Sequence, residues 1–169
     1  MLTEADRPRL AEHLAASWGS TSVVSRGRLH EAAELPGFVA SDGGRWLGYS
    51  AYEIVGSSME VVVLDSPMPE RGAGSALIAA CADLALQRGL ERLWLVTTND
   101  NLRALRFYQR RGFVLVDLRP GAVDEARRTL KPEIATVGLD EIPIRDELEL
   151  ELPRDVWPGF VERHRWPSI

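Results

Sequence analysis

Hydrophobic residues at the start of the chain recur at helical spacing. Leu10, Leu14 and Trp18 lie four residues apart and share one helix face, which predicts an amphipathic helix over residues 7–18. A Gly-Ser pair then ends the pattern, and two valines at residues 23–24 indicate the start of a strand. The sequence therefore predicts a helix followed by a strand at this end of the chain.

The next region alternates apolar runs with turn residues. Runs at residues 37–41 and 45–54 flank an Asp-Gly-Gly turn, and this pattern predicts a β-hairpin. A third run, at residues 59–64, is apolar except at Glu60 and rich in valine, as expected for a strand buried on both faces. We therefore expect an antiparallel meander in the first third of the chain.

Beyond residue 64 the hydrophobic period changes from that of a strand to that of a helix. Residues 65–74 contain two prolines and two glycines, which predict a loop. Apolar residues then follow one helix face from Ser75 to Arg88, and Gly89 is suited to the C-cap. The sequence thus predicts a helix that begins directly after a glycine-rich loop.

Strand and helix patterns continue to alternate after this helix. Strands are predicted at residues 92–97 and 113–118, on either side of a helix at residues 101–111 that Gly112 ends. A βαβαβ-like centre of this kind, appended to a meander, predicts an α/β or α+β fold.

The last third of the chain has weaker patterns. A short helix is predicted at residues 123–130, and alternating Glu and Leu at residues 147–152 predict a half-exposed strand. Residues 153–169 contain two tryptophans and three prolines and are expected to form a C-terminal tail. We expect residues 1–169 to form a single domain.

The composition is that of an ordinary globular domain. With 169 residues, of which 45% are hydrophobic, the chain can bury a full core. Its single cysteine, Cys81, excludes an intramolecular disulfide and a cysteine-rich metal site, and its place on an apolar helix face indicates a core residue. No apolar run approaches the roughly 20 residues that span a membrane. The first residues lack a signal-peptide pattern, so we expect a cytoplasmic protein without a membrane partner.

The net charge of −5 is unevenly distributed along the chain. Residues 71–111 carry seven arginines against three acidic residues, whereas residues 140–155 carry seven acidic residues against two arginines. The negative total argues against a nucleic-acid partner. The basic centre suits a polyanionic ligand, and the acidic end, through Glu147, Glu149 and Glu151, suits a cationic amine. Ordinary solvated faces are the alternative interpretation of both regions.

A glycine-rich segment lies between the third apolar run and the helix that follows it. Its glycines let the backbone approach a ligand, and the N–H groups of a helix start form an anion site. A nucleotide-hydrolase P-loop needs a lysine here, but the only lysine in the chain is Lys131. A dinucleotide fingerprint needs a third glycine, and Leu77 stands in its place. A plain glycine-rich turn is the remaining alternative on the residues alone.

This segment resembles the Arg/Gln-x-x-Gly-x-Gly/Ala signature of the GNAT superfamily of N-acetyltransferases, with Arg71, Gly74 and Ala76 at its defined positions. Residues 101–113, Asn-Leu-Arg-Ala-Leu-Arg-Phe-Tyr-Gln-Arg-Arg-Gly-Phe, are similar to the family's Asn-x-x-Ala-x-x-Phe/Leu-Tyr-x-x-x-Gly-Phe run. Either motif alone is weak, but both in the right order at the expected separation are specific. The resemblance implies a mixed, mostly antiparallel central sheet with flanking helices.

The resemblance implies a reaction as well as a fold. It implies direct transfer of the acetyl group of acetyl-coenzyme A (acetyl-CoA), as co-substrate, to a primary amine, and it allows a homodimer. The sequence does not identify the amine. The alternative is a noncatalytic acyl-CoA-binding sensor or interaction module, because no acceptor-site signature is evident and the C-terminal segment is aromatic.

The resemblance also assigns residues to the co-substrate. The pyrophosphate is expected on backbone N–H groups at the helix start. The pantetheine amides are expected along the central strand, where one N–H can also face the thioester carbonyl. Asn101 is expected to reach the pantetheine arm, with a simple N-cap as its alternative role. The residues expected at the helix start and on the strand are Arg71, Gly72, Ala73, Gly74, Ser75 and Ala76, and Val62, Val63 and Leu64.

Two residues are expected to carry the chemistry. Tyr108 lies two helical turns after Asn101 and is the candidate acid for the departing thiolate, with a core tyrosine as the alternative. Glu60 is the first candidate for the base that deprotonates the amine, and Glu53 and Tyr52 are weaker candidates.

Other polar groups have weaker signals. Arg103, Arg106 and Arg110 share one helix stripe and can face either the 3′-phosphate of the co-substrate or solvent. The three histidines lie outside both motifs, so we expect surface groups and predict no metal site.

Overall fold

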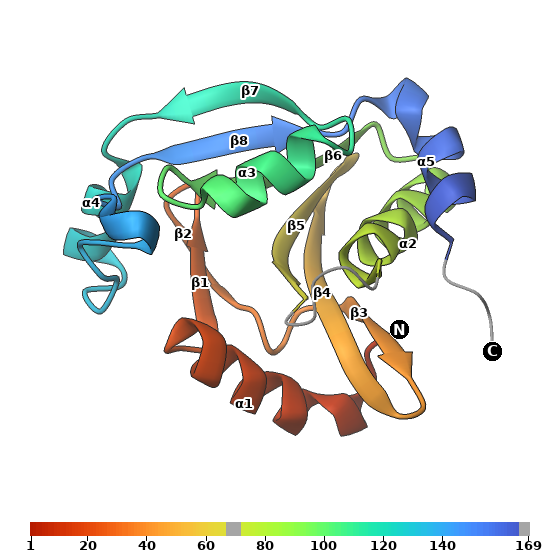
Figure 1. The fold of residues 1–169 in the computed structure, drawn as a ribbon, viewed down its shortest axis with the longest axis horizontal. Helices are drawn as coiled ribbons and strands as arrows, with labels where there is room; N and C mark the ends of the chain where they lie inside the picture. The colour runs from red at the N-terminus through yellow and green to blue at the C-terminus, as the bar shows by residue number, and fades with distance from the viewer. Residues whose placement is uncertain (67–71, 166–169) are drawn as a thin grey trace.

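The computed structural model describes residues 1–66 and 72–165, and it has a mixed α/β fold (Figure 1). The main sheet has six strands in the order β3-β4-β5-β6-β8-β7, and only the β5–β6 pair is parallel. Helices flank this sheet, and a separate two-stranded sheet, β1-β2, lies beside it. The expected fold class, a mostly antiparallel central sheet with flanking helices, is confirmed.

The amphipathic pattern at the start of the chain was interpreted correctly. Helix α1 spans Arg7–Trp18, and Gly19 follows it in the left-handed conformation. Leu10 and Leu14 are fully buried. Strand β1 (Ser22–Ser25) includes the predicted valines, whereas its partner β2 (Arg28–Glu31) was not predicted. The pair forms a two-stranded ribbon that covers part of the main sheet.

The predicted meander is also confirmed. Strands β3 (Gly37–Asp42), β4 (Arg45–Val55) and β5 (Ser58–Asp65) pair antiparallel in chain order. The turn between β3 and β4 uses Gly43 and Gly44, both at positive φ, as a tight hairpin requires. This meander forms one half of the main sheet.

Helix α2 (Ala73–Gln87) begins two residues earlier than predicted. Gly72 at φ +77° is the residue before its first turn, so Ala73 and Gly74 are helical rather than part of the loop. Cys81 is fully buried on this helix, and burial raises the pKa of its thiol to about 12. Among the described residues, no helix combines the length and the hydrophobicity needed to cross a membrane.

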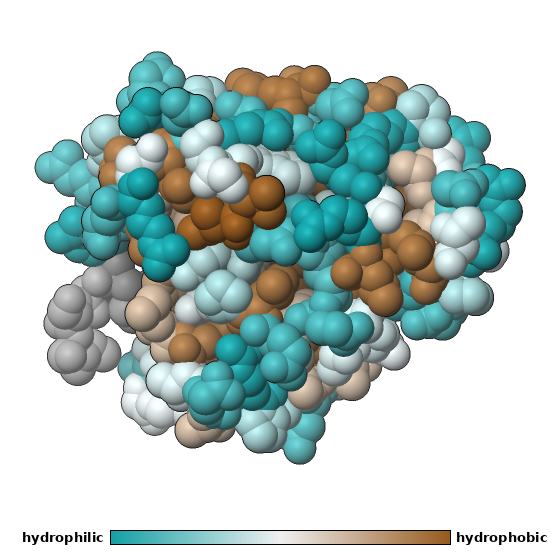
Figure 2. Space-filling view, turned by 180° about the vertical axis from the view of Figure 1, so that it is seen from behind, coloured by the Kyte–Doolittle hydropathy of each residue, from teal (hydrophilic) through white to brown (hydrophobic). Residues whose placement is uncertain are grey.

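Strand β6 (Arg92–Thr98), helix α3 (Leu102–Gln109) and strand β7 (Val114–Arg119) follow in the predicted order. Helix α3 ends two residues before the predicted end, because Arg110 and Arg111 form the turn that precedes Gly112. Strand β7 is the last strand of the sheet and exposes its hydrophobic side chains. Figure 2 shows such side chains along the upper edge of the molecule, where Figure 1 places β7.

Strand β8 (Glu147–Glu151) corrects the prediction of a half-exposed strand, because it lies between β6 and β7. Its Glu147 and Glu149 are 3% exposed. They are buried because arginines of other strands reach them: Arg92 donates to both Glu149 and Glu151, and Arg119 lies 3.9 Å from Glu147. Burial and pairing with arginines therefore leave no exposed acidic face on β8 where one was expected, although Glu147 lines the cavity described below.

The chain after β7 forms two further helices, and the second of them belongs to the core. Helix α4 spans Ala122–Thr129. At the other end of β8, helix α5 (Trp157–His164) packs on α2. Trp157 is fully buried and donates from Nε1 to the carbonyl of Leu152 at 2.7 Å. The described part of the expected tail is therefore a core helix.

Candidate active site

The main sheet opens between its two parallel strands. Strands β5 and β6 pair only from Ser58 to Glu60, and no register partners follow. Just beyond, the pairing of β5 with β4 shifts by one residue at Val62, which is a β-bulge. Because a bulge bends its strand, β5 turns away from β6 and leaves its backbone edge unpaired on that side.

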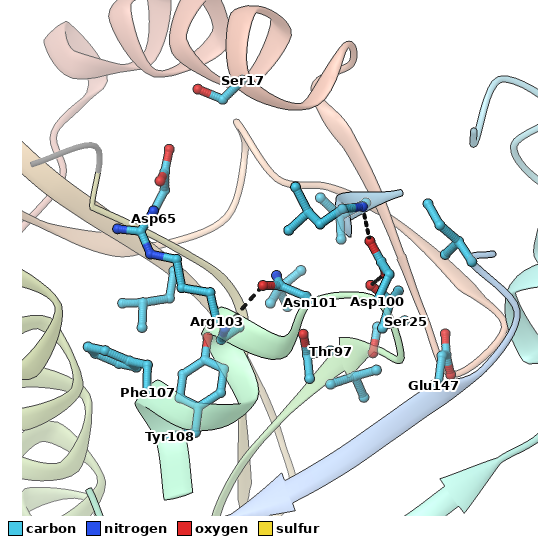
Figure 3. Close-up of a pocket in the computed structure, with 18 of the residues that line it drawn as sticks. Ser17, Ser25, Asp65, Thr97, Asp100, Asn101, Arg103, Phe107, Tyr108 and Glu147 are labelled. Carbon is cyan, nitrogen blue, oxygen red and sulfur yellow. Dashed lines mark hydrogen bonds between the residues drawn. The ribbon is translucent and has the colours of Figure 1, made fainter. Parts of the chain in front are cut away.

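A cavity of about 1180 Å³ lies in this opening. Its walls come from β5, the start of α2, helix α3, strand β1 and the segment after α4. Figure 3 shows Tyr108 and Asn101 on the α3 side, Asp65 at the end of β5, and Ser17 of α1 across from them. The cavity therefore joins elements that are far apart in the sequence.

Most of the expected site residues line this cavity. The lining residues among them are Glu60, Val62, Leu64, Gly72, Ala73, Gly74, Ser75, Asn101 and Tyr108. Val63 and Ala76 do not line it: Val63 is 1% exposed and packs with Leu10 and Leu14, and Ala76 is buried within α2. Arg71 lies outside the described residues.

The start of α2 presents backbone N–H groups to the cavity. The residues Ala73, Gly74 and Ser75 precede the first intrahelical donor, Ala76, whose N–H bonds to the carbonyl of Gly72 at 3.0 Å. Such N–H groups and the helix dipole together attract an anion. The geometry at this end of the cavity suits a pyrophosphate.

Four arginines surround the same end. They come from α3 and the turn after it, and they are Arg103, Arg106, Arg110 and Arg111. Arg111 is fixed by three contacts: its Nε donates to Ser75 Oγ at 2.7 Å, its Nη1 donates to the carbonyl of Phe107 at 3.0 Å, and its guanidinium lies 3.5 Å from the centre of the Phe107 ring. The predicted stripe of three arginines therefore faces the cavity, and Arg111 adds a positive charge that the sequence did not single out.

The position of Asn101 is compatible with both roles that the sequence left open, the N-cap of α3 and contact with the pantetheine arm. Its Oδ1 accepts from the backbone N–H of Ala104 at 3.1 Å, which caps α3. The side chain also borders the cavity, where its Nδ2 is the group that can donate to an amide carbonyl.

Tyr108 combines a core position with access to the cavity. Its ring packs between Phe107 and Phe113, with ring centres 5.3 Å and 5.4 Å away, and the residue is 8% exposed. Its hydroxyl points into the cavity (Figure 3). Burial, with a smaller contribution from Asp65, raises the pKa of the hydroxyl, so the group is protonated at neutral pH.

Glu60 lies on the floor of the cavity where β5 and β6 part. The residue is 6% exposed, and its Oε1 accepts a hydrogen bond from Ser25 Oγ of β1. Burial raises the pKa of this carboxyl, and the Ser25 hydrogen bond opposes the shift only in part. Sequence reasoning did not find Ser25, because the two residues are 35 positions apart and β1 reaches β5 only in the folded chain.

His30 is the main correction to the expected site, since it is 4% exposed and not a surface group. It lies on β2 beside Glu53 and Glu60, and one ligand atom of each residue lies within 4.8 Å of the others. Glu53, the weaker candidate base, does not line the cavity. Neither does Tyr52, which stacks on Phe38 in the core at 5.7 Å.

Sequence reasoning also missed polar residues at the far end of the cavity. Thr97, Asp100 and Lys131 line it there, beside Glu147, which the sequence had named with Glu149 and Glu151 as suited to a cationic amine. Asp100 accepts from the N–H of Leu139 at 3.1 Å, and Lys131 donates from Nζ to the carbonyl of Ser22 at 2.5 Å. These bonds hold the segment after α4 over the cavity. No local pattern indicates them, because each joins segments distant in sequence.

Comparisons with known proteins agree with this geometry. Residues 6–113 match the model of the acetyltransferase (GNAT) family. The protein YdhI of Bacillus subtilis (strain 168) is 38% identical over 140 residues, which cover 82% of this chain and 87% of YdhI. The structure of the ribosomal-protein-S18-alanine N-acetyltransferase of Escherichia coli superposes with a TM-score of 0.62 at 19% identity over 90% of both chains.

A second solved structure has the same fold. It is a GNAT family acetyltransferase from Elizabethkingia anophelis with acetyl-CoA bound, and it superposes with a TM-score of 0.59 at 17% identity, over 68% of this chain and 73% of that one. The match of the family model covers more than half of the 169 residues and includes both motifs. On this evidence the chain belongs to the GNAT family of acetyltransferases.

Proposed function

We propose that this protein is an N-acetyltransferase that transfers the acetyl group of acetyl-CoA to a primary amine by direct attack. The observation that carries the proposal is the cavity at the opening of β5 and β6. The N–H groups of α2 and four arginines line this cavity together with Glu60 and Tyr108. A polyanionic co-substrate and a reacting amine can therefore meet in it.

The anionic end of the co-substrate fits the start of α2. Ala73, Gly74 and Ser75 offer N–H groups to the pyrophosphate, and Arg103 and Arg106 offer positive charge to the 3′-phosphate. Arg71 is proposed at the same site from the sequence motif alone. The pantetheine arm then runs along the unpaired edge of β5 past Val62 and Leu64, within reach of Asn101.

The backbone of β5 supports the reaction as well as binding. Strand β6 no longer pairs with β5 beyond Glu60, so a backbone N–H near the bulge at Val62 can face the thioester carbonyl. One well-placed donor to a developing oxyanion contributes about 3 kcal/mol to transition-state stabilisation. We propose this role for the N–H groups of residues 62–64.

Glu60 and Tyr108 divide the proton transfers between them. An alkylammonium has a pKa near that of lysine, about 10.4, so it must lose a proton before its nitrogen can attack. Glu60 accepts that proton, either directly or through water. Tyr108, whose hydroxyl is protonated at neutral pH, donates a proton to the departing thiolate. The acceptor is a primary amine that reaches Glu60 within the cavity, which Ser25 and Thr97 also line.

The structure offers less support for a noncatalytic binding module. That alternative depended in part on the aromatic C-terminal segment as an interaction surface, but Trp157 and Phe160 are 0% and 1% exposed in the core. Among the described residues, four exposed apolar side chains lie together on edge strand β7. We propose β7 as the contact of a homodimer, through Val114, Leu115, Val116 and Leu118.

The function is tested with the purified protein and two measurements. Calorimetry measures acetyl-CoA binding, with NAD as the control nucleotide, and a thiol-release assay measures turnover with a panel of small amines, polyamines and peptides with free N-termini. We expect binding of acetyl-CoA only, and thiol release with at least one amine. Binding without release across the whole panel would support the noncatalytic alternative.

A further inference from the structure

A buried histidine lies behind the proposed base and has no role in the reaction described so far. His30 of β2 is 4% exposed, and its Nε2 has no hydrogen-bond partner among the described residues. Its Nδ1 lies 3.8 Å from Oε2 of Glu53. An unpaired polar nitrogen in a protein interior costs free energy, and such groups concentrate where a function requires them.

The neighbours of His30 form a path from the cavity to the surface. Glu60 and Glu53 are register partners on β5 and β4, so their carboxylates lie on the same face of the sheet. One nitrogen of His30 and one oxygen of each carboxylate lie within 4.8 Å of one another. Small rotations or a single water can close gaps of this length. The Glu53 side chain is 25% exposed, and it pairs with the exposed Arg28 at 2.9 Å.

The proposed reaction leaves one proton on Glu60 after each turnover. The attacking ammonium loses two protons as it becomes an amide. One replaces the proton that Tyr108 gives to the coenzyme A thiolate, and the other stays on Glu60. Glu60 must lose that proton before the next cycle. With the acetylated product and coenzyme A still in the cavity, the carboxyl is shut off from solvent on that side, because the residue is only 6% exposed even without them.

We propose that His30 is a proton relay that carries the proton of Glu60 to Glu53 and from there to solvent. The relay rests on the proposed function, in which Glu60 is the base. His30 Nε2 or Nδ1 takes the proton from the Glu60 carboxyl, and the imidazolium passes a proton to Glu53. Its charged and titratable neighbours are Glu60 of β5, Glu53 of β4 and Arg28 of its own strand. His30 acts through Glu60 and is a positioning residue.

The same three residues also have the composition of a metal site, but their contacts favour the relay. Glu53 already accepts a hydrogen bond from Arg28 Nη2 and forms an ion pair with Nη1 of the same side chain, and Glu60 accepts a hydrogen bond from Ser25. A divalent ion would have to displace Arg28, whose positive charge repels a cation beside Glu53. Metal binding is therefore treated below as an outcome that overturns the relay.

The relay is tested by separating the first turnover from later ones. Rapid-mixing measurements of thiol release compare the wild type with His30→Gln, at saturating acetyl-CoA and amine and mildly alkaline pH. Because the relay acts after the chemical step, we expect His30→Gln to keep the rate of the first turnover and to lower kcat about tenfold, which appears as a burst. Equal slowing of the first turnover and of the later turnovers, or no change in either, would contradict the relay.

Chemical rescue distinguishes proton transfer from a structural effect. Imidazole in the buffer should raise kcat of His30→Gln towards the wild-type value as its concentration rises, whereas a displaced Glu60 would not respond to buffer. The matched control is His164→Gln on α5, whose ring lies 3.0 Å from the carbonyl of Phe160 and does not line the cavity. We expect neither a burst nor a buffer effect in the control. The absence of rescue in His30→Gln overturns the proposal.

Two further measurements do not depend on turnover. NMR titration of the His30 ring in the wild type and in Glu60→Gln should show that its midpoint moves when the carboxylate is removed, and an unmoved midpoint overturns the relay. Metal analysis of the purified protein should find no stoichiometric zinc, and zinc that is lost in His30→Gln overturns it too. If the wild type releases no thiol with any amine but the His30 midpoint moves in Glu60→Gln, the proposed function is wrong, whereas the interaction between His30 and Glu60 is supported.

Discussion

Gly74 of α2 lies directly against the ring of Phe107 of α3. A Cβ at position 74 would be 2.9 Å from Phe107 Cζ, closer than such atoms approach in proteins. The guanidinium of Arg111 stacks on the same ring, and its Nε donates a hydrogen bond to Ser75 Oγ at the start of α2. The absence of a side chain at residue 74 therefore sets the spacing of the two helices that border the anionic end of the cavity.

Replacing Gly74 with alanine should separate these helices. The added methyl group would have to move the Phe107 ring, and overpacking of this kind costs about 1–3 kcal/mol. We expect a loss of unfolding free energy in this range and an affinity for acetyl-CoA lowered about tenfold, because the N–H groups of α2 and the arginines of α3 would no longer face one ligand. Denaturant unfolding and calorimetry measure the two effects.

The contact itself can be tested by a compensating change. In Gly74→Ala/Phe107→Leu the smaller side chain makes room for the methyl group, so the double variant should bind acetyl-CoA more tightly than Gly74→Ala. Phe107→Leu alone is the reference, since it also removes the stacking with Arg111. A double variant no better than Gly74→Ala would show that the Phe107 contact does not set the helix spacing.

Tyr108→Phe should separate chemistry from binding. The substitution removes the hydroxyl and keeps the ring that packs on Phe107 and Phe113. Loss of a general acid typically costs 10²–10⁴-fold in rate, so we expect kcat to fall by about 100-fold with nearly unchanged affinity for acetyl-CoA. Steady-state kinetics and calorimetry provide the comparison. An unchanged kcat would leave Tyr108 as a core residue only.

The elements that could be predicted from the sequence depend on local signals. Helix α1 matches its predicted bounds because apolar spacing and Gly19 both act within a few residues. The start of α2 was placed two residues late because Gly74 was assigned to the glycine-rich loop, whereas the helix begins at Ala73, directly after Gly72 at its left-handed φ of +77°. The end of the cavity near α2 could be predicted because its signal is also local: a glycine-rich turn and the helix after it form one continuous segment.

The other end of the cavity could not be predicted, because it is assembled from distant segments. Ser25 meets Glu60 only when β1 folds against β5. The buried glutamates of β8 looked exposed in the sequence, since alternation with leucine is the pattern of a half-exposed strand. Their partner arginines come from β6, β7 and the β1–β2 turn. Long-range charge pairing of this kind leaves no periodic signal.

The pairing of β8 with β6 gives a stability prediction. Arg92 donates to Glu149, whose side chain is 4% exposed, so Arg92→Met would remove the main partner of a buried charge. Leaving such a charge without its partner costs on the order of 2–3 kcal/mol, and Arg26, 3.5 Å away, compensates in part. The matched control is Arg128→Met, which removes an exposed ion pair with Glu125 and should cost less than about 1 kcal/mol.

Denaturant unfolding at neutral pH measures both variants. The expected order is wild type, then Arg128→Met, then Arg92→Met, from most to least stable. Equal stability of the two variants would contradict the prediction, because it would mean that Arg92 does not stabilise the buried Glu149.

Glu60 gives a pH dependence whose sign follows from its burial. Burial raises the pKa of its carboxyl, so the folded protein holds this proton more tightly than the unfolded chain does. The corresponding stability is fully present below the ordinary pKa and is lost as the pH rises through the raised one. Unfolding free energy should therefore fall across this window more in the wild type than in Glu60→Gln. Burial also raises the pKa of Glu147 in both proteins, and the charge of Glu60 adds to that shift only in the wild type.

The same ionisation should control activity in the opposite direction. Only the carboxylate form of Glu60 can accept a proton, so kcat/KM of the wild type should rise with pH through the raised pKa, above the usual range of a glutamate. Glu60→Gln should lose this rising limb and retain a low, flatter rate. The pH at which wild-type activity appears should coincide with the pH at which the Glu60-dependent stability disappears, because both measurements report one proton. Two separate midpoints would assign the base to another residue.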